Sequence, residues 1–174
     1  MNADDIYNLL KEKFGDSILE MVSDIPTEPI ISIEPMKINE VSEYLRDAEN
    51  LQFDSLMNLS GFDDNNAEKV VNNDETSTML GGTLSVFYHL YSYELKHKIA
   101  LKISTNRDNP EVESVTPVWG AANWHEREAY DMFGLKFLNH PDMGRLLMPY
   151  DWEGYPLRKD YENPEFYEGM KIPY

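Results

Sequence analysis

Cysteine is absent from the 174 residues of this chain. Its absence excludes a disulfide scaffold, a thiol nucleophile, a cysteine-ligated zinc site and an iron–sulfur cluster held by this chain. Long apolar runs are absent too, because no stretch reaches the roughly 18 residues of a membrane-spanning helix. The opening residues, MNADDIYNLLKEKF, are amphipathic and carry acids early, which is not the pattern of a secretory signal or a transit peptide.

Basic residues are scarce: Lys and Arg total 15 against 32 Asp and Glu, a formal net charge of −17. Such a chain repels phosphate backbones and anionic lipid headgroups, so we expect neither nucleic-acid binding nor direct membrane binding. Residues 1–75 hold 18 acids and 5 bases, whereas residues 76–174 hold 14 acids and 10 bases. We therefore expect the second half to carry the function.

Recognised catalytic and nucleotide-binding motifs are missing as well. The sequence contains no G-x-G-x-x-G, no Walker loop and no G-x-S-x-G elbow. No two histidines have the spacing of a zinc-binding helix. His89 and His97 fall in or beside predicted strands, where packing or edge positions are expected for them.

The apolar pattern predicts an α+β domain, a small and mostly antiparallel sheet covered by helices, with an extended irregular C-terminal tail. Helices are expected over 4–14, ended by Gly15, and over about 40–49, capped by Asn39. Strands are expected at 30–33, 83–92, 97–104 and 112–118, and 83–92 should form a hairpin with 97–104. Residues 51–59 are expected under the sheet, and the polar residues 61–82 should form an exposed loop or hairpin tip. The domain should span 1–147 and the tail 148–174.

A motif helix is predicted over about 124–133, WHEREAYDMF. Asn123 is the expected N-cap with Glu126 at the third helical position, and Gly134 is the expected stop. On this helix Arg127 can pair with Asp131, and His125 can meet Glu128.

Two interpretations of the acids near this helix stay open. In the first interpretation these residues form a metal or acid–base site, made of His125, Glu126, Glu128, Asp131, His140 and Asp142. The other is structural, because carboxylates in the first turns of a helix are favoured by its dipole without any catalytic role.

The tail contains four prolines and seven of the 21 aromatic residues, without helical or strand periodicity. The prolines prevent one continuous helix. Aromatics left in water would cost roughly 1.5–3 kcal/mol each, so the tail is expected to lie against another surface. This composition favours a tail that binds a partner, and the alternative is a tail that folds back over its own domain.

The segment from Trp119 to Tyr161 closely resembles one family. It reads EREAYDMFG at 126–134, then Phe137, HPD at 140–142, RLL at 145–147 and DWEGYPLRKDY at 151–161. In order and spacing it resembles the thirty-kilodalton (C) subunit of proton-pumping NADH-quinone oxidoreductase (respiratory complex I). The sequence departs from the family pattern at Asn139, where Gly is usual, at Gly144–Arg145, where two bases are usual, and at Tyr155, where many relatives have His.

The resemblance implies a subunit of the hydrophilic arm that binds no cofactor of its own. Iron–sulfur clusters, and FMN where an NADH module exists, belong to partner subunits, and quinone is the substrate of the complex. The expected partners are the hydrogenase-like large subunit and the adjacent iron–sulfur subunit. The expected location is the cytoplasmic side of the inner membrane, reached only through the complex.

Residue roles follow from the resemblance together with side-chain chemistry. The expected ion-pairing anchors are Arg127, Arg145, Arg158 and Lys159. The residues expected to order the helix and the following turn are Glu126, Glu128, Asp131 and His140. The expected interface hot spots are Trp152, Tyr155 and Tyr161.

Two alternatives to this function remain. The first is the equivalent subunit of a membrane-bound hydrogenase, or of a related ferredoxin- or deazaflavin-dependent complex. The second is an autonomous metal- or carboxylate-dependent hydrolase that uses His125, Glu128 and Asp131.

Overall fold

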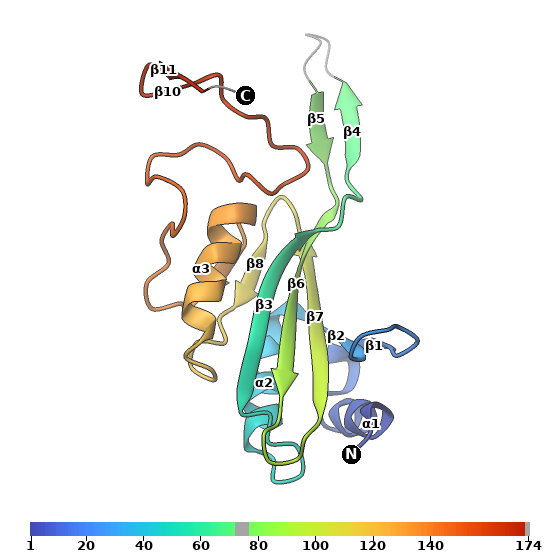
Figure 1. The fold of residues 1–174 in the computed structure, drawn as a ribbon. Coiled ribbons are helices and arrows are strands. Elements are labelled where there is room, and N and C mark those ends of the chain that lie inside the picture. The colour runs from blue at the N-terminus through green and yellow to red at the C-terminus, as the bar shows by residue number, and fades with distance from the viewer. Residues whose placement is uncertain (72–76, 173–174) are drawn as a thin grey trace.

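A computed structural model describes residues 1–71 and 77–172 (Figure 1). Its α-helices are α1 (Ala3–Phe14), α2 (Ile38–Asp47) and α3 (Ala122–Phe133), with 3-10 turns at Gly15–Ser17 and Pro35–Lys37. Its longer strands are β1 (Ile18–Val22), β2 (Ile30–Ile33), β3 (Ser55–Asp63), β4 (Glu68–Val71), β5 (Ser77–Leu80), β6 (Thr83–Tyr91) and β7 (Lys98–Asn106). Its shorter strands are β8 (Glu111–Glu113), β9 (Lys136–Leu138), β10 (Phe166–Tyr167) and β11 (Met170–Lys171).

The central sheet has five strands in the order β1-β2-β7-β6-β3. Its neighbours run antiparallel except β2 and β7, which are parallel with Ile30 opposite Ala100. β6 and β7 pair over their whole length, so the predicted hairpin is confirmed. The α+β class with a small, mostly antiparallel sheet is confirmed as well.

The core lies between this sheet and the first two helices. α2 lies behind the strands in the view of Figure 1. Because side chains alternate along a strand, every second residue of β6 faces the helices. The buried side chains that meet there include Ile6 and Leu10 of α1, Val41 and Leu45 of α2, and Leu84, Val86, Tyr88 and Leu90 of β6.

Three local predictions in the first half are wrong or incomplete. Asn39 does not cap α2, because it lies inside that helix, and its side chain donates to the Ser114 oxygen at 2.7 Å. Residues 55–59 do not lie under the sheet but form part of its edge strand β3. β1 is not among the predicted strands. Only its first residue, Ile18, is buried, so its sequence need not alternate apolar and polar residues as a half-buried strand does.

The polar segment 61–82 contains the end of β3 and then the hairpin of β4 and β5, which agrees with a hairpin tip. Residues 72–76 of that segment lie outside the described residues. The strand predicted over 112–118 is shorter than expected, because β8 ends at Glu113. β8 pairs in parallel with β9, which places Val112 opposite Phe137 beside α3.

After β9 the described chain forms no helix or strand until the two-residue strands β10 and β11. This irregular course agrees with the absence of periodicity in the tail sequence. None of the helices within residues 1–71 and 77–172 is long and apolar enough to cross a bilayer.

Candidate functional site

Helix α3 packs against the edge strand β3, and glycines permit the close approach. A Cβ at Gly61 of β3 would lie 2.6 Å from the Phe133 ring. Gly134 ends the helix in the left-handed conformation at φ 75°, and its N–H donates to the Tyr130 oxygen at 2.8 Å. The predicted motif helix and its stop are therefore confirmed.

The predicted start of that helix is wrong. α3 begins at Ala122 with Ala121 as N-cap and without a side-chain cap, so Asn123 lies inside the helix. Glu126 is fully buried instead of facing the helix start. Its carboxylate accepts from Ser114 Oγ at 2.6 Å and from the Val115 N–H at 2.8 Å, which ties the β8–α3 connection to the helix. Burial raises the pKa of Glu126 to about 7, although these hydrogen bonds favour its charged form.

His140 lies beside Glu126, and its side chain is fully buried. The His140 Nε2 is 4.0 Å from Glu126 Oε2 and 3.2 Å from the Asn123 carbonyl oxygen. The Asp142 N–H donates to His140 Nδ1 at 3.1 Å. Because a carbonyl only accepts and an N–H only donates, Nε2 acts as the donor and Nδ1 as the acceptor in these two contacts.

Asp131 organises the segment that follows β9. Its buried carboxylate accepts from the N–H groups of Leu146 (2.9 Å), Leu147 (2.6 Å) and Met148 (2.9 Å). It also pairs with Arg145 Nη1 at 2.7 Å. Burial alone would raise the pKa of Asp131, but these hydrogen bonds outweigh it and hold the pKa below the ordinary value. The predicted Arg127–Asp131 pair does not form, since Arg127 donates to the Gly144 and Arg145 carbonyls instead.

Arg145 and Arg158 shape residues 145–161, called the strap below. Arg145 Nη2 donates to the Trp152 and Gly154 oxygens at 2.7 and 3.1 Å. The Arg145 and Arg158 guanidinium groups lie over the Tyr155 ring, 5.6 and 4.6 Å from its centre. Arg158 Nε donates to the Phe133 oxygen at 2.5 Å, which fixes the strap to the end of α3.

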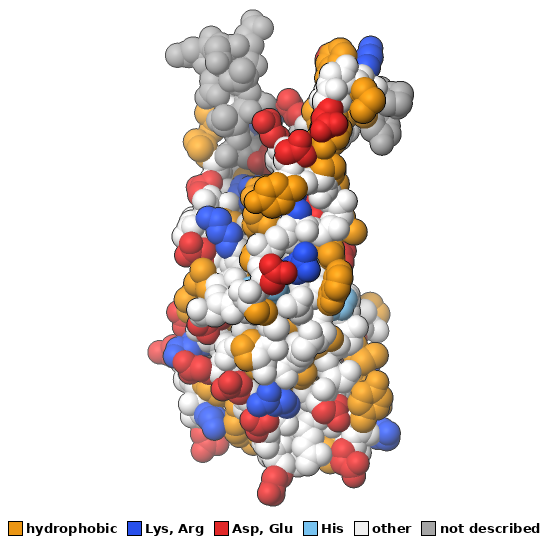
Figure 2. Space-filling view, turned by 90° about the vertical axis from the view of Figure 1, so that its left-hand side faces the viewer, with side chains coloured by type: hydrophobic (Ala, Val, Ile, Leu, Met, Phe, Trp, Pro, Cys, Tyr) orange, Lys and Arg blue, Asp and Glu red, His pale blue; other side chains and the backbone are white. Residues whose placement is uncertain are grey.

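The aromatic residues expected as hot spots are half-buried within the strap. Trp152 Nε1 donates to the Tyr161 hydroxyl at 3.0 Å, and Tyr155 packs edge-on against Tyr130 of α3. The exposed apolar side chains of this region are others: Trp124 of α3 (62% exposed), Leu147 (62%), Tyr150 (92%) and Leu157 (53%). Figure 2 shows this side of the molecule, where apolar side chains are interspersed with charged ones.

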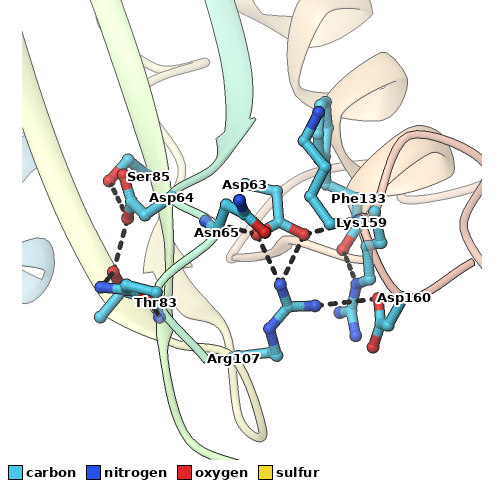
Figure 3. A network of polar contacts seen from close by, with 11 residues as sticks. Asp63, Asp64, Asn65, Thr83, Ser85, Arg107, Phe133, Lys159 and Asp160 are labelled. Carbon is cyan, nitrogen blue, oxygen red and sulfur yellow. Dashed lines mark hydrogen bonds and ion pairs between the residues drawn. The ribbon is translucent and has the colours of Figure 1, made fainter. Parts of the chain in front are cut away.

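Two residues that the sequence interpretation missed also hold the strap. Asp63, at the end of β3, accepts from the Lys159 N–H at 2.8 Å, and Arg107, just after β7, pairs with Asp160 at 2.9 Å (Figure 3). Lys159 thus contributes its backbone here, while its side chain is exposed. An isolated Asp and Arg at strand ends give no local pattern that would have identified them.

Residues 31–167 match the family described as respiratory-chain NADH dehydrogenase, 30 Kd subunit. The chain belongs to this family. A relative from Chlorobium phaeobacteroides, named as a subunit of NADH-quinone oxidoreductase, is 40% identical over 171 residues, which cover 97% of this chain and 93% of the relative. A relative of the same name from Chloroherpeton thalassium is 39% identical over 170 residues, which cover 97% of this chain and 64% of the relative. The chain thus spans nearly all of the Chlorobium relative but only 64% of the length of the Chloroherpeton relative.

Two solved structures share the fold of this family member. The trypsin-resistant fragment (1-134) of Nqo5 matches with a TM-score of 0.58 at 21% identity, covering 79% of this chain and 98% of the fragment. A chain of the membrane-bound sulfane sulfur reductase, an archaeal respiratory membrane complex, matches with a TM-score of 0.61 at 20% identity, covering 91% and 85%. At these identities the likeness shows the fold alone.

The three residues of the hydrolase alternative, His125, Glu128 and Asp131, do not line one common cleft. His125 and Glu128 line a cleft of about 270 Å³ between α3 and β3. Asp131 is not among the lining residues, and its carboxylate is occupied by Arg145 and three backbone amides. Across residues 1–71 and 77–172, no three His, Asp or Glu side chains are arranged to hold a metal ion.

Proposed function

We propose that this chain is a non-catalytic subunit of the hydrophilic arm of a proton-translocating NADH- or ferredoxin-quinone oxidoreductase. It binds the hydrogenase-like large subunit and the adjacent iron–sulfur subunit on the cytoplasmic side of the inner membrane. In this proposal the iron–sulfur clusters, and FMN where an NADH module exists, reside in partner subunits. The chain supports their assembly and reaches the membrane only through them.

The observation that carries this proposal is the pair of exposed aromatic side chains on α3 and on the internally fixed strap. Tyr150 is 92% exposed, although both neighbouring parts of the strap are fastened by Asp131 and Arg145. Trp124 is 62% exposed, and the Arg127 guanidinium lies 5.4 Å from the centre of its ring. Trp, Tyr and Arg are the residue types that dominate protein–protein binding energies.

The names of the relatives support the same proposal. Those from Chlorobium and Chloroherpeton are named as subunits of NADH-quinone oxidoreductase. The structural likeness to a membrane-bound sulfane sulfur reductase favours keeping one alternative, the equivalent subunit of a related complex such as a membrane-bound hydrogenase.

Substitution of Tyr150 by Ala tests the docking surface. Removing a hot-spot aromatic costs about 2 kcal/mol or more of binding free energy. The affinity for the partner subunits should therefore fall about thirtyfold, and less of them should co-purify. The melting temperature should stay unchanged, because the side chain is almost fully exposed. Leu19→Ala is the matched control, since Leu19 is an apolar residue that is 55% exposed on the far edge strand β1.

The readout is the set of proteins recovered with the tagged chain from gently solubilised membranes of its host, identified by mass spectrometry. Recovery of quinone-site and iron–sulfur subunits supports the proposal, and a flavin-binding module among them identifies NADH as donor. Recovery of the chain alone, from the soluble fraction, would refute it.

A further inference from the structure

Asp63 and Arg107 form a buried ion pair at one end of the sheet, outside both α3 and the strap (Figure 3). Asp63 is the last residue of β3, and Arg107 follows the last residue of β7. Both Asp63 oxygens accept from Arg107 Nη2 at 2.5 Å. The side chains are 1% and 3% exposed, so neither can touch a partner protein directly.

The pair reaches the strap through two contacts. The Lys159 N–H donates to Asp63 Oδ2 at 2.8 Å, and Arg107 Nη1 donates to Asp160 Oδ1 at 2.9 Å. The preceding residue, Arg158, is bonded to the Phe133 oxygen and lies over Tyr155. The contacts at Lys159 and Asp160 therefore also restrict the backbone at the neighbouring Arg158.

The pair is a costly way to close this end of the sheet. Desolvation of two charges often cancels their attraction, so an apolar pair of similar size would be as stabilising. Arg107 Nε adds to the cost, because it is buried without a hydrogen-bond partner in the described part of the chain. Burial alone would raise the pKa of Asp63, but the amides of Lys159 and Asn65, together with Arg107, lower it.

Unlike an apolar pair, the ion pair can also form hydrogen bonds with the strap, at Lys159 and Asp160. We propose that Asp63 and Arg107 are positioning residues that keep the second half of the strap in one arrangement for docking to the partner subunits. This inference rests on the proposed function. Because both side chains are buried, they act through Lys159 and Asp160 and not by contact with the partner.

The test compares three carboxylate-to-amide variants of the full-length tagged chain. Asp63→Asn weakens both strap contacts, and Asp160→Asn removes only the charge on the strap side and leaves the buried pair intact. Asp64→Asn is the matched control, because Asp64 Oδ2 accepts from Thr83 and Ser85 and touches no strap residue. If Asp63→Asn does not fold, Asp160→Asn decides the test alone.

Three measurements are made on each variant: the melting temperature, amide hydrogen exchange at residues 159–161, and recovery of partner subunits from solubilised membranes. We expect amide exchange at 159–161 to be about tenfold faster in Asp63→Asn and Asp160→Asn. The reason is that weaker contacts let this part of the strap open more often and expose its hydrogen-bonded amides to water. Partner recovery should fall in these two variants, and Asp160→Asn should leave the melting temperature unchanged. Asp64→Asn should change neither exchange at 159–161 nor recovery.

The outcomes separate this inference from the proposed function. Unchanged exchange at 159–161, or faster exchange with full partner recovery, would overturn the positioning role. If Tyr150→Ala lowers recovery while Asp160→Asn does not, docking stands and the inference fails. If neither Tyr150→Ala nor the strap variants lower recovery, the docking proposal itself fails.

Discussion

Glu126 and Asp131 lie on the same helix and are both fully buried, yet their surroundings move their pKa values in opposite directions. Asp131 receives a guanidinium and three backbone amides, which together stabilise its charge more than burial disfavours it. Glu126 receives two hydroxyls and one amide but no cation, so burial prevails. The proton on Glu126 is therefore held in the folded state at pH values where an exposed glutamate would lose it.

This predicts an unusual pH dependence for folding. The pKa of Glu126 rises from 4.5 to about 7 on folding, so its contribution to stability is complete below pH 4.5 and is lost as the pH rises towards 7. The loss is on the order of 3 kcal/mol. Glu126→Gln resembles the protonated form, so its free energy of unfolding should decline less between pH 5 and 7 than that of the parent chain, in urea unfolding at each pH.

Glu128→Gln is the control, because Glu128 is exposed on the same helix. Its stability profile should follow that of the parent chain. Parallel profiles for Glu126→Gln and the parent would show that the pKa of Glu126 is not raised and that its carboxyl group is already ionised at pH 5 in the folded chain.

At the scale of elements, the junction between α3 and the strap decides the local structure. The helix ends at Gly134, and the strap returns over that end, where the Leu157 N–H donates to the Met132 oxygen at 3.1 Å. A Cβ on Gly134 would lie 2.6 Å from Tyr155 Cε2 and 2.7 Å from Arg158 Nη2. The residue is thus required both for its backbone conformation and for the space above it.

Gly134→Ala should consequently destabilise the fold and loosen the strap. The left-handed conformation alone costs alanine about 1–2 kcal/mol, and displacement of Tyr155 and Arg158 adds to it. Thermal and urea unfolding measure the loss, for which Gly120→Ala is the control, since nothing lies within 4 Å of a Cβ there. Equal stability of the two variants would contradict the tight junction.

Elements whose signal is local were predictable from the sequence, and those that depend on distant partners were not. The helices α1 and α3, and the β6–β7 hairpin, each show their periodicity and stop residues within one segment. The prediction of Asn123 as N-cap was wrong because α3 begins at Ala122 and Glu126 accepts from the Val115 N–H in the connection before the helix. Helical periodicity carries no information about such a contact. The contacts of the site join residues far apart: 15 to 17 positions separate Asp131 from the amides it binds, and 96 separate Asp63 from Lys159.

At the scale of the whole molecule, charge opposes compaction. The net charge of −17 places many carboxylates on one small surface, and the 15 bases can neutralise fewer than half of the 32 acids. Mutual repulsion of like charges destabilises a compact state and is screened by salt. The buried pairs formed by Asp63 and Asp131 are shielded from this screening by their burial.

Salt should therefore stabilise the isolated chain. Raising the NaCl concentration from about 10 mM to about 150 mM shortens the screening length from about 30 Å to about 8 Å, and the melting temperature at pH 7.5 should rise by a few degrees. Near pH 5, closer to the sequence pI of about 4.4, the same step should have a smaller effect. A melting temperature that falls with salt would mean that attractive surface pairs outweigh repulsion.

The parallel pairing of β2 with β7 also sets the order in which a newly made chain can fold. β2 is complete at Ile33, but its partner begins only at Lys98. At about 5–20 residues per second, a ribosome needs several seconds to bridge that interval. Until then the nascent chain presents an unpaired strand edge and an uncovered apolar helix face, the features that chaperones bind and that favour aggregation. The emergence of β7 is therefore the step at which the newly made chain can pair β2 and join the first two helices to the central sheet.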